Sequence, residues 1–251
     1  MKRFVAALQF LTVCPCLADI RCSEHDLGRS VPFFPAVGLL IGAAVGLLDR
    51  AAIHFFPPLL ASVIAVVALI GASGGLHMDG LADTADGFFS SRPRERILEI
   101  MKDSHIGAMG VIGIVCVFCL KVAALASIPL PLRFPVLLLM PLAGRCALVM
   151  HLAALPYARA EGGICTVFVK HRLKQDSLLA ATFLALVGWA AAGPMGLAAA
   201  GLTVAATLVL SLWCWRKIGG FTGDTLGAAC ELTELVPALV GAACLCAKGG
   251  S

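Results

Sequence analysis

The chain has 251 residues, of which 60% are hydrophobic and 14% are charged, with a formal net charge of +4. Soluble domains carry about 25% charged residues, so this composition excludes an ordinary soluble protein, and the lack of basic runs interleaved with aromatics argues against a nucleic-acid partner. Backbone groups in lipid must be paired internally, and the long apolar runs show no strand-like alternation. We therefore predict an all-α fold, a polytopic integral membrane helical bundle that forms a single domain over residues 1–251.

About seven stretches are long and apolar enough to cross a bilayer, which takes about 20 residues. In chain order they run over residues 33–54, 58–77, 107–128, 134–155, 177–193, 195–215 and 226–247. The preceding segment, MKRFVAALQFLTVCPC, has no cleavage site followed by a soluble domain, and we expect an interfacial or re-entrant helix there. Most of the eleven cysteines lie in apolar runs, and we interpret them as core residues.

The basic residues predict how the chain lies in the membrane. Most of the 19 Lys and Arg residues fall in segments 1–32, 79–106, 156–176 and 216–225, which share one side if the predicted spans are right. The positive-inside rule places that side, and the N-terminus, in the cytoplasm. Most acidic residues lie in the same segments, so we expect the active site at the cytoplasmic face.

The stretch HMDGLADTADGFF follows an apolar run and contains three aspartates. If it continues a helix, Asp79, Asp83 and Asp86 stand at positions i, i+4 and i+7 on one face. Carboxylates this close repel one another unless a cation lies between them, and Mg²⁺ prefers such oxygen ligands. A solvated acidic loop would explain the acids but not Gly80 and Gly87, because glycine is costly in a helix and useful where a substrate or another backbone comes close.

The next stretch, SSRPRERILEIMKDSHIGAMG, predicts an interfacial amphipathic helix from Arg94 to Met101, which Pro93 can start. Lys102 and Asp103 then lie at the mouth of the following span. The Asp103 carboxylate is a candidate fourth metal ligand, and the Lys102 ammonium could neutralise phosphate oxygens.

A second polar set closes the chain in RKIGGFTGDTLGAACELTE. Thr222 is a candidate helix cap, and Asp224 stands where a helix begins. Glu231 and Glu234 lie inside the last apolar span, where carboxylates are expensive and indicate function. Arg145, also at membrane depth, is their natural countercharge; the alternative is that Arg145 and a glutamate only tie helices together.

In the loop LPYARAEGG, Tyr157 and Arg159 could recognise a base, a phosphate or a hydroxyl group. Clustered aspartates with glycines and several basic residues at a membrane boundary indicate metal-assisted phosphoryl transfer. Two other classes stay open. A metal-ion transporter would be expected to place acids nearer the membrane midplane, and a purely structural membrane protein would leave the aspartate face unexplained.

The long segment GGLHMDGLADTADGFFSSRPRERILEIMKDSHIGAMG resembles the signature of the cobalamin synthases, the adenosylcobinamide-GDP ribazoletransferases. So do FLTVCP, FFPAVGLLIG, YARAEGG and GGFTGDTLGAACELTE, in order along nearly the whole chain. His105 departs from the arginine expected in that family. The CDP-alcohol phosphatidyltransferase-like phospholipid synthases use a similar motif, but Asp83 and Thr84 stand where theirs has Ala-Arg, so this family is the runner-up.

The resemblance implies a Mg²⁺-dependent reaction of vitamin B12 assembly in a multi-pass protein of the bacterial inner membrane. The ribose 3′-hydroxyl of α-ribazole, or of α-ribazole 5′-phosphate, attacks the corrinoid-side phosphate of adenosylcobinamide-GDP, and GMP leaves. Association with a second copy or with other cobalamin-assembly enzymes stays open. The resemblance implies Mg²⁺ ligands that are also catalytic at Asp79, Asp83, Asp86 and Asp103, and substrate-binding residues at His77, Lys102, Arg145, Tyr157, Arg159, Thr222, Asp224, Glu231 and Glu234.

Overall fold

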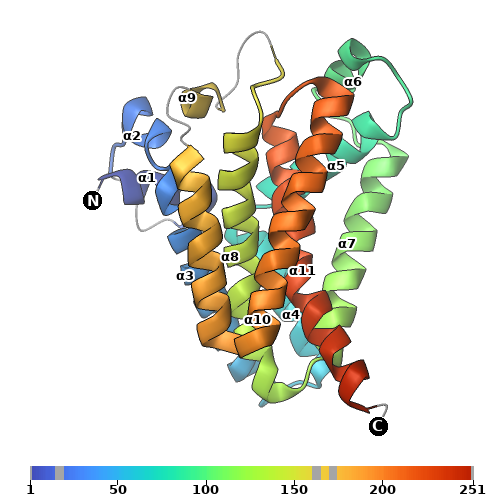
Figure 1. Ribbon diagram of the computed structural model, residues 1–251. Helices are drawn as coiled ribbons and strands as arrows, with labels where there is room; N and C mark the ends of the chain where they lie inside the picture. The colour runs from blue at the N-terminus through green and yellow to red at the C-terminus, as the bar shows by residue number, and fades with distance from the viewer. Residues whose placement is uncertain (1, 15–19, 160–164, 170–173, 250–251) are drawn as a thin grey trace.

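A computed structural model describes residues 2–14, 20–159, 165–169 and 174–249. Within these ranges every regular element is helical, and the one extended pairing is an isolated bridge between Tyr157 and Phe221 (Figure 1). The predicted all-α class is therefore confirmed for the described residues. The elements are α1 (Lys2–Leu11), α2 (Glu24–Gly28), η2 (Val31–Phe33), α3 (Phe34–Ala52), α4 (Pro58–Ala72), α5 (Leu76–Phe88), α6 (Arg94–Ile100), α7 (Ala108–Ser127), α8 (Leu130–Ala154), α9 (Thr166–Val169), α10 (Lys174–Ile218) and α11 (Gly223–Gly249).

In the described part of the chain, five helical segments are long and apolar enough to cross a membrane, or six if the bent pair α4 and α5 counts as one span. The predicted span 58–77 is shorter than expected: α4 ends at Ala72, and α5 departs from it at 88°. The predicted spans 177–193 and 195–215 both fall inside α10, on either side of Gly193, whose positive φ of 57° separates two helices. Figure 1 shows the second part of α10 folding back along the first. A polytopic helical bundle is thus confirmed, and the count of seven stays a prediction.

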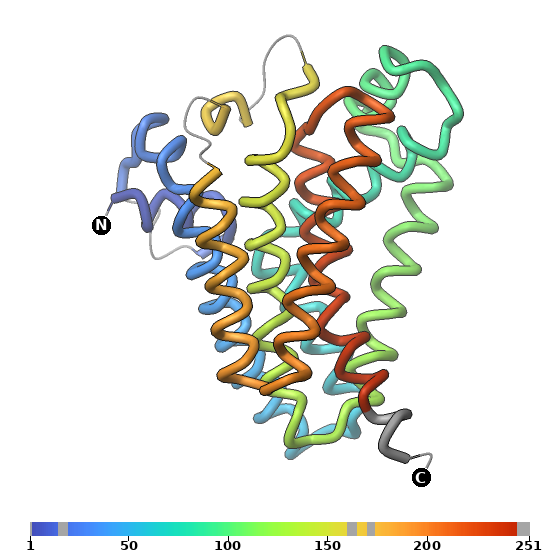
Figure 2. Tube along the Cα trace, in the orientation of Figure 1, coloured from blue at the N-terminus to red at the C-terminus, as the bar shows by residue number. Residues whose placement is uncertain are grey.

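Helix α8 runs through the middle of the bundle (Figure 2). Most residues of its apolar stretch are buried, and they pack against α3, α10 and α11. Glycines on the side of α3 that faces α8 explain how closely the two helices pack, because a Cβ at Gly38 or Gly42 would lie 2.5 Å from a backbone oxygen of α8.

A buried ion pair holds the end of the bundle where α3 ends and α8 begins. Arg133 of α8 donates to both carboxylate oxygens of Asp49 of α3, at 2.5 and 3.0 Å. Its Nη1 donates to the carbonyl of Leu125, and its Nη2, which also donates to Asp49, donates to the hydroxyl of Ser62. Buried charges need such complete pairing, so this arginine joins four helices.

Candidate active site

Helix α5 carries the three aspartates at one end of the bundle. Residues 76–88 are helical, as expected, which places Asp79, Asp83 and Asp86 along one side of α5. The carboxylates of Asp79 and Asp83 make no hydrogen bond or ion pair with any part of the chain that the structure describes. These two acids are therefore available to an external ligand.

Asp86 is engaged differently. One carboxylate oxygen accepts a hydrogen bond from the backbone N–H of Gly107 at 2.7 Å, and the other accepts from Gly110 at 2.8 Å. Both amides belong to the first turn of α7, whose N–H groups have no partner within the helix. Asp86 thus caps α7 from a neighbouring helix, and the carboxylate complements the positive end of the helix dipole.

A close approach between α5 and α11 brings a fourth acid to this face. A Cβ at Gly80 would lie 2.7 Å from the backbone oxygen of Asp224 and 3.2 Å from the Cα of Gly227. Only glycine allows this contact, so Gly80 serves the approach of another backbone, as its position in the motif suggested. Asp83 consequently interacts electrostatically with Asp224, as it does with Asp79 and Asp86.

Two backbone hydrogen bonds set the loop that carries Arg159. Ala158 donates to the carbonyl of Phe221 and Phe221 donates to that of Pro156, both at 2.8 Å. The guanidinium of Arg159 then donates to Asp224 at 2.7 Å. Arg159 and Asp224, two predicted substrate-binding residues from distant parts of the sequence, are therefore in direct contact, and their contact with substrate stays a prediction.

Neighbouring groups support this ion pair. The hydroxyl of Thr222 accepts from the backbone N–H of Thr225 at 3.2 Å, which confirms Thr222 as a cap of α11. Thr222 also donates to Asp224 at 3.2 Å. Burial, with a smaller contribution from Cys165, raises the pKa of Tyr157 above its ordinary value of 10, so its hydroxyl is protonated at neutral pH.

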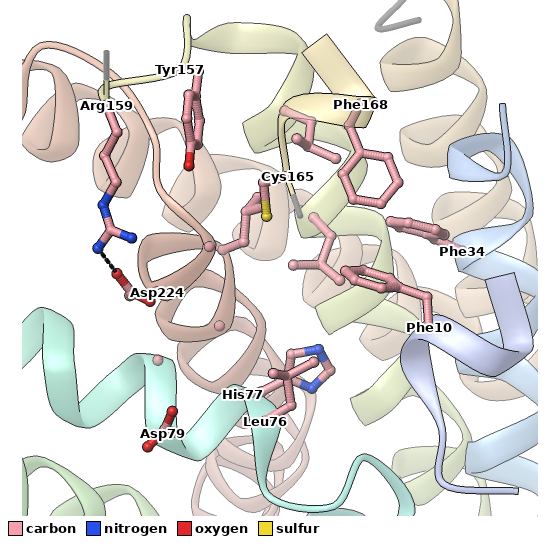
Figure 3. Close-up of a pocket in the computed structure, with 16 residues that line it drawn as sticks. Phe10, Phe34, Leu76, His77, Asp79, Tyr157, Arg159, Cys165, Phe168 and Asp224 are labelled. Carbon is pink, nitrogen blue, oxygen red and sulfur yellow. Dashed lines mark hydrogen bonds and ion pairs between the residues drawn. The ribbon is translucent and has the colours of Figure 1, made fainter. Parts of the chain in front are cut away.

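Two cavities meet at Asp79. The first, of about 230 Å³, has Asp79, Arg159 and Asp224 on one side and phenyl rings on the other (Figure 3). The second, of about 340 Å³, is also lined by Asp79. Its other polar lining residues are Asp83, Lys102, Asp103 and Ser104. Eight predicted site residues line one of these two cavities, and Asp79 lines both: His77, Asp79, Asp83, Lys102, Asp103, Tyr157, Arg159 and Asp224.

Asp103 lies at the exposed edge of the second cavity. It pairs with His105, whose ring nitrogen is 2.7 Å away and whose backbone N–H is 3.0 Å away. These two hydrogen bonds lower the pKa of Asp103 below its usual range. The acid is therefore ionised throughout the neutral range, as a metal ligand must be.

Four other charged side chains form a network deeper in the bundle. Lys121 of α7 contacts Glu231 at 2.6 Å and Glu234 at 2.8 Å, and Arg145 of α8 pairs with Glu234. All four are buried, and none lines either cavity. The predicted pairing of Arg145 with a glutamate is confirmed. Contact of Arg145, Glu231 or Glu234 with substrate stays a prediction.

Sequence reasoning missed three contributors. Lys121 looked like an isolated charge within a span, and nothing local pointed to Glu231. Arg94 donates to the carbonyls of Ile218 at 2.7 Å and Ala158 at 2.9 Å, so it ties α6 to α10 and to the Arg159 loop. Lys217 donates to the carbonyl of Phe88 at the end of α5. These contacts join segments more than 60 residues apart, for which the sequence holds no local signal.

The acids of the site fit a hard divalent cation in their chemistry. Among the described residues, no group of three His, Cys, Asp or Glu side chains converges closely enough to hold a metal. Mg²⁺ commonly takes one or two carboxylates and completes its shell with water and substrate phosphate. Asp79 and Asp83, which have no hydrogen-bond or ion-pair partner among the described residues, suit that role, whereas the carboxylate of Asp86 already accepts from two backbone amides.

Comparison with known proteins agrees with this reading of the sequence. The family model described as cobalamin-5-phosphate synthase matches residues 3–242. A relative from Acetivibrio thermocellus named adenosylcobinamide-GDP ribazoletransferase is 38% identical over 93% of this chain and 94% of its own length. Proteins of the same name from Geotalea daltonii and Desulforamulus reducens are 36% and 38% identical, over 94% and 91% of this chain and 95% and 91% of their own lengths.

No solved structure matches the chain significantly. None of these three relatives is named as a CDP-alcohol phosphatidyltransferase or a transporter, which were the alternatives. The family model covers almost the whole chain, and each relative exceeds 30% identity over nine-tenths of it. The chain therefore belongs to the cobalamin-5-phosphate synthase family of cobalamin biosynthesis.

Proposed function

We propose that this protein joins adenosylcobinamide-GDP to α-ribazole or α-ribazole 5′-phosphate. The oxygen of the ribose 3′-hydroxyl forms a bond to the corrinoid-side phosphorus, and the bond from that phosphorus to GMP breaks. The hydroxyl proton leaves, and the products are GMP and adenosylcobalamin or its 5′-phosphate. The family match carries this proposal, because the three relatives described above are named for this transfer.

The charged side chains of the site support the proposed transfer reaction. Phosphoryl transfer depends on positioning and on neutralising negative charge. Arg159, fixed by Asp224 at 2.7 Å, presents a guanidinium to the first cavity, and Lys102 presents an ammonium to the second. We assign both to the phosphates of the GDP moiety, with the Tyr157 hydroxyl as a further donor.

We also propose Mg²⁺ as the metal, with Asp79 and Asp83 as its protein ligands and Asp103 nearby. When bound, the ion would neutralise the pyrophosphate and polarise its phosphorus–oxygen bonds. From the sequence, Asp86 is expected to be a Mg²⁺ ligand as well. In this proposal Asp86 has a positioning role instead, because its carboxylate accepts two backbone hydrogen bonds.

The positive-inside count supports an N-terminus in the cytoplasm and a site on the cytoplasmic side of a bacterial inner membrane. Counting α10 as two spans about Gly193 and the α4–α5 pair as one gives the seven spans that we propose. A bulky, charged corrinoid nucleotide would then reach the acids from the aqueous side.

The direct test is GMP release by detergent-purified protein supplied with adenosylcobinamide-GDP, α-ribazole 5′-phosphate and Mg²⁺. We expect Asp79→Asn to lower the rate about 100-fold or more, because a charged ligand is lost. Glu99→Gln is the matched control: it neutralises an exposed acid of α6 that pairs with Arg96 on the same helix. Intact, folded protein that releases no GMP would overturn the transferase proposal. Equal activity of Asp79→Asn and Glu99→Gln would remove Asp79 from the site.

A further inference from the structure

The first cavity has two chemically different ends, and the apolar end is not explained by phosphate chemistry. The acids and Arg159 lie on one side, and three phenylalanines lie together on the other (Figure 3). The residues that form the apolar end are Phe10, Phe34, Leu148, Leu152 and Phe168. A hydrogen-bonding group of a ligand would find no partner among these side chains.

The three rings come from three separate elements. Phe10 of α1 and Phe34 of α3 are nearly parallel, with centroids 5.9 Å apart and 21° between their planes. Phe168 of α9 meets them edge-on, at 5.1 Å from Phe10 and 5.8 Å from Phe34. Phe34 and Phe168 are only 1% and 0% exposed, so the half-buried ring of Phe10 is the one that a flat aromatic ligand would contact.

His77 supplies one polar atom between the two ends (Figure 3). Its ring is 4% exposed, and its Nδ1 has no hydrogen-bond partner in the part of the chain that the structure describes. A buried polar nitrogen without a partner is unfavourable by more than a typical hydrogen bond contributes. The cavity therefore suits a flat, apolar ligand that offers a single hydrogen-bonding atom near its middle.

Building on the function proposed above, we propose that this cavity binds the base of α-ribazole. That base is a dimethylated benzimidazole, a flat bicyclic ring with one unsubstituted ring nitrogen. Phe10, supported by Phe34 and Phe168 behind it, packs against the methylated ring, His77 Nδ1–H donates to the ring nitrogen, and the ribose points toward Asp79 and Arg159. This arrangement brings the ribose hydroxyls to the acids where the transfer takes place.

The other aromatic groups of the substrates fit less well. Guanine and adenine carry several donors and acceptors on their edges, which the apolar end would leave unpaired. The corrin ring is too large, because the cavity of about 230 Å³ is smaller than the roughly 300–1,000 Å³ of sites for drug-sized ligands. One bicyclic base is the group whose size and polarity match.

Binding of α-ribazole 5′-phosphate to purified protein, measured calorimetrically without the corrinoid substrate, tests the inference. Phe10→Leu keeps the side chain apolar but removes one ring, and we expect Kd to rise about 3- to 10-fold. His77→Leu removes the donor and is expected to raise Kd about fivefold, while His77→Asn, which keeps a donor, recovers part of the affinity. Phe55→Leu is the matched control, since Phe55 lies 81% exposed between α3 and α4.

KM values separate this inference from the proposed function. We expect Phe10→Leu to raise KM for α-ribazole 5′-phosphate and to leave KM for adenosylcobinamide-GDP unchanged. If the wild type turns over normally and Phe10→Leu binds α-ribazole 5′-phosphate as the wild type does, the inference alone fails. A rise confined to KM for adenosylcobinamide-GDP would assign the cavity to the other substrate. Folded wild-type protein that forms no product would defeat the proposed function and this inference together. Phe10→Leu decides the matter if His77→Leu does not fold.

Discussion

Substitutions of Asp86 test whether this third aspartate of the motif binds metal or stabilises the fold. Its two carboxylate oxygens accept from Gly107 and Gly110 at 2.7 and 2.8 Å. Hydrogen bonds to a charged group contribute about 1.5–3 kcal/mol each, and water replaces part of this at a half-buried site. We therefore expect Asp86→Ala to lower the free energy of unfolding by about 2–4 kcal/mol, and Asp86→Asn, which keeps one acceptor oxygen, by about 1–2 kcal/mol.

The assay pairs thermal unfolding in detergent with a Mg²⁺ titration of GMP release. Asp86→Asn should unfold at a lower temperature and keep the Mg²⁺ concentration for half-maximal rate within about twofold of wild type, because its side chain is not a ligand. Asp79→Asn should behave in the opposite way, with a nearly normal unfolding temperature and a requirement raised about tenfold or more. Glu99→Gln should match the wild type in both measurements.

One result would refute this reasoning. If Asp86→Asn unfolds like the wild type but needs far more Mg²⁺, the carboxylate leaves the amides of α7 in the working enzyme and binds the metal. The contacts with Gly107 and Gly110 would then describe only a resting arrangement of the site.

Three further perturbations test the packing around the site. Lys121→Met leaves two buried carboxylates without their lysine partner and should lower the free energy of unfolding by about 3–5 kcal/mol, measured by thermal unfolding. Adding Glu231→Gln should restore much of this loss, and equal stability of the single and double variants would contradict the reasoning. Gly80→Ala places a methyl group against the backbone of α11 at Gly227 and should destabilise by about 1–3 kcal/mol with a larger loss of GMP release, whereas wild-type activity would show that α5 and α11 separate freely. Burial raises the pKa of Cys165 to about 11, so its thiol should react slowly with iodoacetamide at pH 7.5 and faster as the pH approaches 11, and rapid labelling at neutral pH, read by mass spectrometry, would refute it.

The features predicted correctly from sequence are those that depend on neighbours along the chain. The helical period placed Asp79 and Asp83 on one side of α5, and the preference for threonine at helix starts identified Thr222 as a cap. Composition alone predicted the bundle, because a chain this apolar cannot form a soluble surface. The break between α4 and α5 was missed, since the apolar run continues past Ala72 and only the backbone at Gly74 and Gly75 turns it.

The features that were missed depend on contacts between distant segments. Helical periodicity predicts the same role, that of a metal ligand, for Asp86 and Asp83, because both lie on one side of a helix. Only the position of α7 shows that backbone amides occupy the Asp86 carboxylate. In the same way, Lys121 and Glu231 are 110 residues apart, and each alone in an apolar span resembles a functional charge.

Two groups of charged side chains differ in this fold, those that are paired inside the bundle and those that line the cavities. Deep in the bundle, the network of Lys121, Arg145 and two glutamates brings two positive and two negative groups together, and another arginine pairs fully with Asp49. Such sites are closed, because an unpaired charge there would destabilise the bundle by several kcal/mol. At the end that carries α5, by contrast, Asp79 and Asp83 have no partner in the described chain and face open cavities. Uncompensated carboxylates beside an arginine and a lysine are stable only where water, a cation or substrate can complete them, so we expect the chemistry of this protein to take place at that end.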